Sequence, residues 1–304
     1  MGSIMTARLK EGGHGPLMLS GARGVPREPM SNDYPKSLAG WTEFLARQDL
    51  PVLRNSAARL AAMREHEEEL DARHMADELS SDPLMVLRTF AHLARQRGSR
   101  PAADVSTLDR AIVMLGVTPF LDAFRELPLV ESGPQSDKGA YRGLLRVMRR
   151  AQQARHYAIR IATWRNDVAA EEIGLAALLH DITEMLVWYF APSLAERIHD
   201  MLAADPRVRS ALAQRVVLGT TLNELQLSLA KRWHLPGLLV QLMDDRHAKT
   251  MRVRNAVLAV NVARHSSLGW SNPALPDDFK EIADLLSITP LRAQSILRPA
   301  SATA

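Results

Sequence analysis

A histidine followed by an aspartate lies inside an apolar helical run of the sequence. Residues 173–187 read IGLAALLHDITEMLV, with His180 and Asp181 in the middle. Burying a carboxylate costs free energy unless the group is paired, hydrogen-bonded or bound to a metal. Adjacent side chains on a helix point about 100° apart, so both reach one ion only where the helix bends or ends. The pair therefore predicts a polar site that other helices must complete.

A helix expected over residues 138–166 provides one such partner, because it carries His156 at a distance that allows a short turn and an antiparallel return. Two interpretations of His180 and Asp181 stay open. They are metal ligands together with His156, or they form a hydrogen-bonded pair that holds helices together; we favour the second. Glu184, one turn further on, is either a base or an ion-pair partner.

The same expected helix carries a stripe of arginines. Its members recur at helical spacing opposite an apolar face: Arg142, Arg146, Arg149 and Arg150. We favour a solvated helix face over a surface for phosphate or an acidic partner. The net charge of +4 is modest for 304 residues, and no DNA-binding motif is recognisable, so we do not expect a nucleic-acid partner.

Composition limits the class of protein. The chain is 46% hydrophobic and lacks a run of about 18 apolar residues, which predicts a globular protein without a membrane span. It contains no cysteine, so disulfides and thiol chemistry are excluded. Its first eight residues lack the apolar core of a signal peptide, and we therefore expect a cytoplasmic protein.

The pattern of apolar residues predicts helices throughout. Alternating β-branched and aromatic runs are nearly absent, and aromatic residues make up 5% of the chain, so the expected fold class is all-α. Residues 1–33 are rich in Gly and Pro and are expected to form a mobile arm. A break around Gly133 separates an N-terminal helical lobe, 34–130, from a second lobe, 137–300. A long helix is expected over 209–233.

The pattern of one histidine followed by a His-Asp doublet resembles the HD superfamily of metal-dependent phosphohydrolases. Five segments follow one another along the chain: Leu50–Leu53, Leu79–Pro83, Val105–Gly116, Leu178–Ile182 and Arg232–Pro236. By these segments and their order, residues 41–297 resemble, more narrowly, the HDOD (HD-related output domain) family. One departure is the sequence His-Leu-Ala at 92–94, where members usually carry Ala-Asn-Ser.

The resemblance also indicates where metal ligands of the active relatives would fall. The first histidine is His156, the doublet is His180 and Asp181, and the final aspartate is replaced by Asn261. Two further ligand positions are Leu222 and the pair Arg246–His247, of which His247 alone can bind a metal. Losing a carboxylate and gaining an arginine weakens cation binding and water activation, so this resemblance implies a degenerate site.

The resemblance implies a multi-helix bundle in which an N-terminal helical lobe packs on an HD-like lobe. We expect a bacterial signal-transduction module without catalysis or cofactor, acting through a signalling protein or a small nucleotide ligand. The alternative is a metal-dependent phosphohydrolase acting on a nucleotide or cyclic dinucleotide. It would need a divalent metal such as Mn, Fe or Mg at His156, His180 and Asp181.

Overall fold

The computed structural model describes residues 34–98, 105–133, 138–205, 207–267 and 269–298. The expected arm, 1–33, lies outside them. The described residues are predominantly helical and contain no strand beyond one isolated bridge, so the all-α prediction is confirmed. The α-helices are α1 (Leu38–Ala46), α2 (Arg54–Glu65), α3 (Ala72–Leu79), α4 (Pro83–Arg97), α5 (Leu108–Leu115), α6 (Val117–Ala123), α7 (Lys138–Trp164), α8 (Ala170–Leu179), α9 (Ile182–Phe190), α10 (Pro192–Ala204), α11 (Ser210–Leu218), α12 (Leu222–Arg232), α13 (Gly237–Leu242), α14 (Met251–Ser266), α15 (Leu275–Leu286) and α16 (Pro290–Leu297). Short 3₁₀ turns are η1 (Glu67–Glu69), η2 (Val130–Ser132) and η3 (Asp245–His247).

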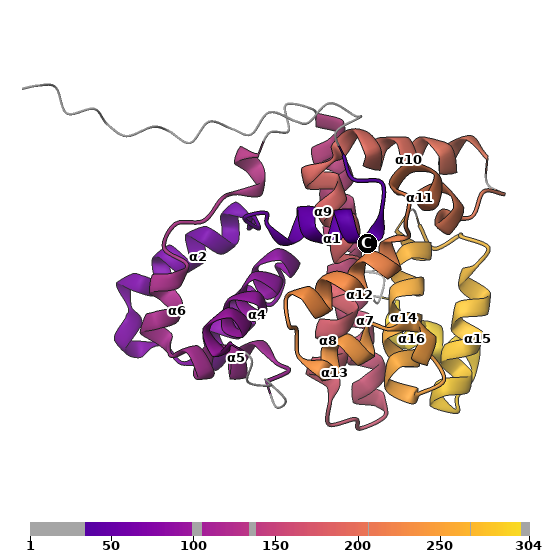
Figure 1. The fold of residues 1–304 in the computed structure, drawn as a ribbon. Coiled ribbons are helices and arrows are strands. Elements are labelled where there is room, and N and C mark those ends of the chain that lie inside the picture. Colours follow the sequence, from indigo (N-terminus) through magenta and orange to yellow (C-terminus); the bar gives the residue numbers. More distant parts are fainter. Residues whose placement is uncertain (1–33, 99–104, 134–137, 206, 268, 299–304) are drawn as a thin grey trace, which may run out of the picture.

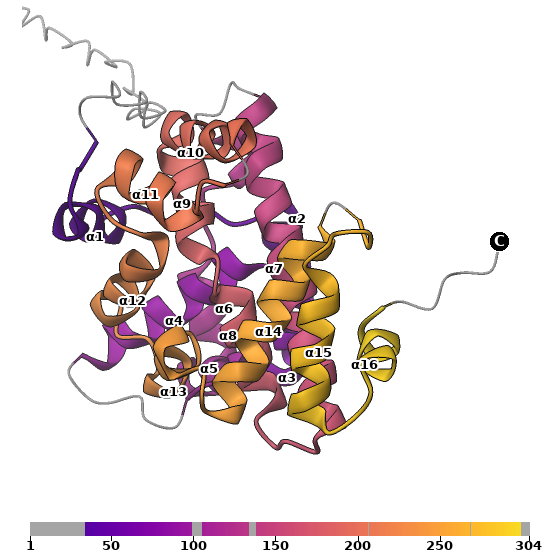
Figure 2. The same ribbon diagram turned by 90° about the vertical axis from the view of Figure 1, so that its right-hand side faces the viewer.

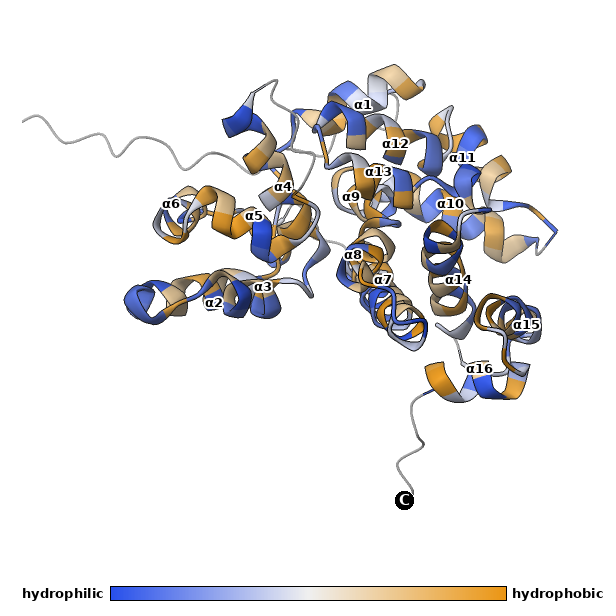
Figure 3. Cartoon of the chain, turned by 90° about the horizontal axis from the view of Figure 1, so that it is seen from below, coloured by the Kyte–Doolittle hydropathy of each residue, from blue (hydrophilic) through white to orange (hydrophobic). Residues whose placement is uncertain are grey.

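Helix α7 forms the centre of the molecule. It packs against α8, α9 and α14, and α4 reaches both α7 and α8 from the other side. Figure 1 shows α2, α4, α5 and α6 on one side of this centre and α10, α11, α14 and α15 on the other. The view turned by 90° in Figure 2 shows α14 and α15 side by side next to α7. Helix α14 contacts both α7 and α15. Seen from below in Figure 3, α7 and α8 lie between the two groups.

The first described residues pack on the second group of helices. The indole Nε1 of Trp41 donates to the carbonyl of Leu218 at 3.0 Å, and the Tyr34 hydroxyl donates to the carbonyl of Phe190 at 3.1 Å. Trp41 is fully buried, and α1 contacts α12. The start of the range expected for the N-terminal lobe therefore lies against helices of the second predicted lobe, α9, α11 and α12.

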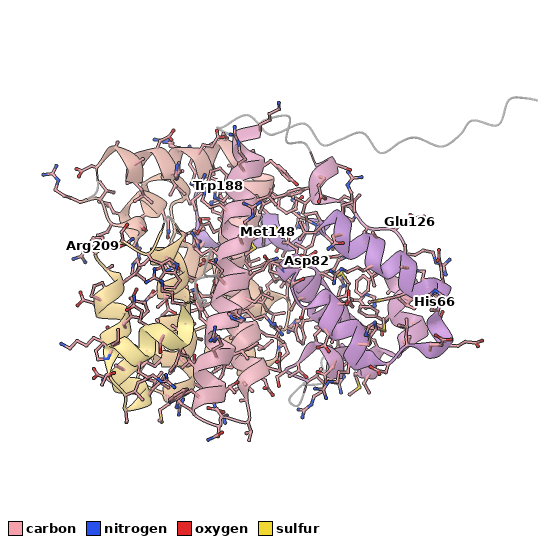
Figure 4. The ribbon with its side chains drawn as sticks, turned by 180° about the vertical axis from the view of Figure 1, so that it is seen from behind. His66, Asp82, Glu126, Met148, Trp188 and Arg209 are labelled. Atoms are coloured by element: carbon pink, nitrogen blue, oxygen red, sulfur yellow. The ribbon has the colours of Figure 1, made fainter. Side chains whose placement is uncertain are left out.

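Asp82 joins the helices of the N-terminal group. It is fully buried at the N-terminus of α4, where its carboxylate accepts hydrogen bonds from the backbone of Leu84 and Met85. It also accepts from the backbone of Leu53 at 2.9 Å and from the Ser56 hydroxyl at 2.7 Å. One side chain thus caps α4 and fixes the start of α2 beside it (Figure 4).

The prediction of one long helix over 209–233 is wrong, because the chain forms two helices there, α11 and α12. Gly219 ends α11 with a φ of 75°, a conformation that favours glycine. An added Cβ at this position would lie 2.1 Å from the Lys36 carbonyl oxygen, so the glycine also permits a close backbone approach. Thr221 then starts α12 with a capping box to Glu224. This break positions α12 beside His180 and Asp181.

One described segment, Ala170–Phe190, is long and apolar enough to cross a membrane by length and composition alone. Its most apolar window is 89% buried inside the fold. The segment is also interrupted between α8 and α9. Burial among other helices accounts for its apolar character, as for the core of a globular protein.

Candidate functional site

The His-Asp doublet lies at the break between two helices. Helix α8 ends at Leu179 and α9 begins at Ile182, so His180 and Asp181 occupy the corner between them. This is the interruption that two adjacent side chains need if they are to serve one site. His180 is 6% exposed and Asp181 is 5% exposed. Both polar groups therefore depend on partners inside the protein.

Two arginines from different helices hold the carboxylate of Asp181. Nε and Nη2 of Arg150 on α7 lie 2.8 and 2.6 Å from Oδ2, and Nη2 of Arg264 on α14 donates to Oδ1. Arg150 Nη2 also lies 2.7 Å from a carboxylate oxygen of Glu184. Burial alone would raise the pKa of Asp181, but the guanidinium groups of Arg264 and Arg150 hold it well below its usual range. Asp181 is therefore a buried, ionised anchor.

His180 contacts a different carboxylate. Its Nε2 lies 2.8 Å from Oδ1 of Asp245, whose Oδ2 accepts a hydrogen bond from Asn223 at 3.1 Å. Its Nδ1 lies 3.6 Å from Asp181 and is buried without a hydrogen-bond partner in the described part of the chain. Burial alone would lower the pKa of His180, but Asp181 and Asp245 outweigh it and raise the pKa above its ordinary value.

A cavity of about 450 Å³ opens beside the doublet. Helices α9, α10, α11 and α12 contribute apolar side chains to its lining, among them Trp188 of α9, which Figure 4 labels. Charged side chains come from α7, the α8–α9 corner, α9, η3 and α14. The apolar lining residues are Val187, Trp188, Ala195, Ile198, Leu202, Ala211 and Leu222, and the charged ones are Arg150, Asp181, Glu184, Asp245 and Arg264. A volume of this size is typical of small-molecule sites.

The other sequence-predicted candidates lie outside this cavity lining. His156 lies at the surface of α7. Partial burial of its ring, together with the positive charge of Arg160, lowers its pKa. His247 in η3 is exposed, with Nδ1 at 3.2 Å from Asp244. Asn261 is half-buried on α14. The structure brings His180 and Asp181 together with Arg150, Glu184 and Asp245, and it does not bring His156, His247 or Asn261 to the same place.

Two arginines of the site differ from the sequence prediction. The prediction of a solvated stripe is wrong for Arg150, whose side chain is 15% exposed and turns inward, whereas Arg142, Arg146 and Arg149 are exposed. Arg264 is not among the predicted site residues, although it lies one helical turn after Asn261. An arginine within one turn of an expected cation ligand was the available signal.

The side chains at the doublet do not fit a divalent metal ion. Both oxygens of Asp181 are engaged by arginines. Within the described ranges, no group of three or more His, Asp or Glu side chains is arranged to hold a metal ion. Arg150 and Arg264 place two positive charges where a cation would bind, which opposes it electrostatically.

Similar proteins agree with this architecture. A crystal structure of a virulence factor from Campylobacter jejuni subsp. jejuni has a TM-score of 0.60 and 19% identity, and the likeness covers 84% of this chain and 92% of that one. The MmoQ response regulator from Methylococcus capsulatus str. Bath has a TM-score of 0.59 and 19% identity, covering 84% and 100% of the two chains. These likenesses concern the fold.

Comparison of the sequence itself is more specific. No curated protein matches the chain. The family model of the HDOD domain, however, matches residues 50–249. This range includes the capped start of α4, the His-Asp corner and η3, and it covers more than half of the 304 residues. The chain therefore belongs to the HDOD domain family.

Proposed function

We propose that the protein is a non-catalytic signal-transduction module that acts by binding a signalling protein or a small ligand. The observation that carries the proposal is the ion pair of Asp181 with Arg150 and Arg264. It joins α7, the α8–α9 corner and α14, so the doublet serves to hold helices together. A fold resembling the MmoQ response regulator is in keeping with a signalling role.

Hydrolysis of a phosphoester by an HD-type centre needs an activated water. A bound divalent metal supplies that chemistry by lowering the pKa of the water. Here the buried carboxylate is neutralised by arginines, and Leu222 lines the cavity with an apolar side chain. Arg246 instead pairs with Asp244 through Nε and Nη2, at 2.8 and 2.6 Å. The chain's own residues thus neutralise Asp181, the carboxylate of the doublet itself.

Metal analysis and turnover assays test this proposal. We expect the purified protein to bind Mn²⁺, Fe²⁺ or Mg²⁺ at far less than one ion per chain. We also expect no hydrolysis of nucleotides or cyclic dinucleotides above a protein-free control. Asp181→Ala and His180→Ala serve as matched variants. Metal-dependent turnover that disappears in both variants, while they remain folded, would establish the phosphohydrolase and refute the proposal.

A further inference from the structure

The cavity beside the doublet contains hydrogen-bonding groups that the protein does not use itself. Arg264 donates through Nη2 to Asp181, and its side chain is 42% exposed, so its other N–H groups face no partner in the described ranges. Nε2 of His180 contacts Asp245 at 2.8 Å, and its buried Nδ1 lies 3.6 Å from Asp181, so this ring serves the protein itself. The exposed donors of Arg264 are therefore the groups in the cavity wall that indicate a place for an acceptor.

Arginine favours oxygen acceptors of a particular kind. The guanidinium group is a planar fork of donors that matches the oxygens of a carboxylate or a phosphate. Arg264 already uses one arm of this fork on a carboxylate, that of Asp181. The remaining donors are therefore suited to a second oxyanion, one brought by a ligand.

The cavity lining also fits an apolar body. Leu202 and Leu222 line it and are half-buried, so part of their apolar surface is open to a ligand. Trp188 and Ile198 are buried and complete this lining, and the Trp188 ring is held edge-to-face by the ring of His199, with 6.4 Å between the ring centroids. Covering exposed apolar surface is favourable. The cavity therefore offers both polar and apolar surface to one ligand.

Charge limits how many negative groups the ligand carries. Arg150 and Arg264 are balanced by Asp181 and Glu184. Asp245, at the rim, adds a further carboxylate beside His180. A polyphosphate would bring several negative charges into a cavity whose own charges already nearly cancel, whereas a single oxyanion adds little repulsion.

We infer that this cavity binds a small molecule with one oxyanionic group, a carboxylate or a phosphate monoester, on an apolar body. Arg264 holds the oxyanion, and Leu202 and Leu222 pack on the body. The inference rests on the proposed function, because it makes the same doublet a receptor instead of a hydrolytic centre. It specifies the ligand class through which such a module receives a signal.

Calorimetric titration of the full chain tests this with four probes: 2-naphthoate, 2-naphthyl phosphate, neutral 2-naphthamide and inorganic phosphate. We expect at least one naphthyl oxyanion to bind one molecule per chain, at least tenfold more tightly than 2-naphthamide and than inorganic phosphate. Arg264→Ala should weaken that binding at least tenfold. Arg254→Ala, on the same helix but outside the cavity, should leave it unchanged.

Comparing the four probes on the wild-type chain tests the inference even if Arg264→Ala fails to fold. Preference for the carboxylate or for the phosphate identifies the source of the oxyanion and supports the inference either way. Absence of binding by both naphthyl oxyanions, or equal binding of 2-naphthamide, overturns it. Metal-dependent turnover would refute the proposed function separately, whichever probe binds.

Discussion

Replacing Asp181 by alanine removes the carboxylate that two arginines share, and we expect it to destabilise the fold. Arg150 and Arg264 would then lie close together without their common counter-charge. Like charges repel, and a buried charge without a partner is costly. The variant therefore tests whether the doublet is a structural anchor before any function is measured.

The size of the effect follows from exposure and the remaining partners. Removing one member of a fully buried ion pair costs about 3–5 kcal/mol. Here Arg150 keeps its contact with Glu184 at 2.7 Å, and the Arg264 side chain is 42% exposed, so water compensates part of the loss. We therefore expect the unfolding free energy to fall by about 2–3 kcal/mol, which corresponds to a decrease in melting temperature of roughly 4–12 °C.

Urea unfolding followed by circular dichroism measures this difference directly. Asp205→Ala is the matched control, because Asp205 pairs with the exposed Arg207 at the end of α10 and should leave the unfolding free energy unchanged. A double-mutant cycle of Asp181→Ala with Arg264→Ala should show coupling above about 0.5 kcal/mol. If Asp181→Ala is as stable as the wild type, the two arginines do not depend on the carboxylate and the reasoning is wrong.

Three further predictions concern other parts of the fold. Asp82→Ala removes four hydrogen bonds from the start of α2 and α4 and should lower the unfolding free energy by about 2–4 kcal/mol in urea titrations. Burial lowers the pKa of His180, but nearby carboxylates raise it overall. The contribution of protonated His180 to the unfolding free energy should therefore be complete below about pH 6.5 and be lost as the pH rises through the raised pKa. His180→Asn should remove this pH dependence of the unfolding free energy. Gly143→Ala places a Cβ 2.5 Å from the Trp188 ring and should cost about 1–3 kcal/mol.

Each of these predictions has a control or a contrary result. Ser80→Ala, two residues before Asp82, removes a hydroxyl that donates to the Asp77 carbonyl and should have a small effect by comparison. An unchanged pH dependence in His180→Asn would exclude His180 as the source of the slope. Gly237→Ala adds a Cβ with nothing within 4 Å and should be tolerated; equal losses at 143 and 237 would refute the steric argument.

The helical class and the need of His180 and Asp181 for partners on other helices could be predicted from the sequence, because both depend on local signals. Apolar periodicity defines helices, and polar side chains inside an apolar run need partners within the fold. The division at Gly219 was also signalled locally, by the glycine and the following Thr221–Glu224 capping box, but helical periodicity masked it. A glycine followed by a capping box therefore indicates a helix boundary even where apolar periodicity continues across it.

The partners of the doublet were beyond local reasoning. Arg264 lies 83 residues after Asp181, and the two meet because α14 packs against α7 and α8. Arg150 belongs to a run of arginines that look alike in sequence, and tertiary packing turns one of them inward. Choice among equivalent side chains depends on how helices cross, which a single sequence does not specify.

The two guanidinium groups at the α8–α9 corner have a consequence for the conditions under which the protein can work. A cation that belongs to the chain is present from the moment of synthesis, cannot be stripped by a chelator and cannot be exchanged for a wrong ion. It also stays charged at every physiological pH. A fold held together in this way would keep its shape when iron or manganese is scarce, because no metal ion is needed to bring α7, α14 and the α8–α9 corner together.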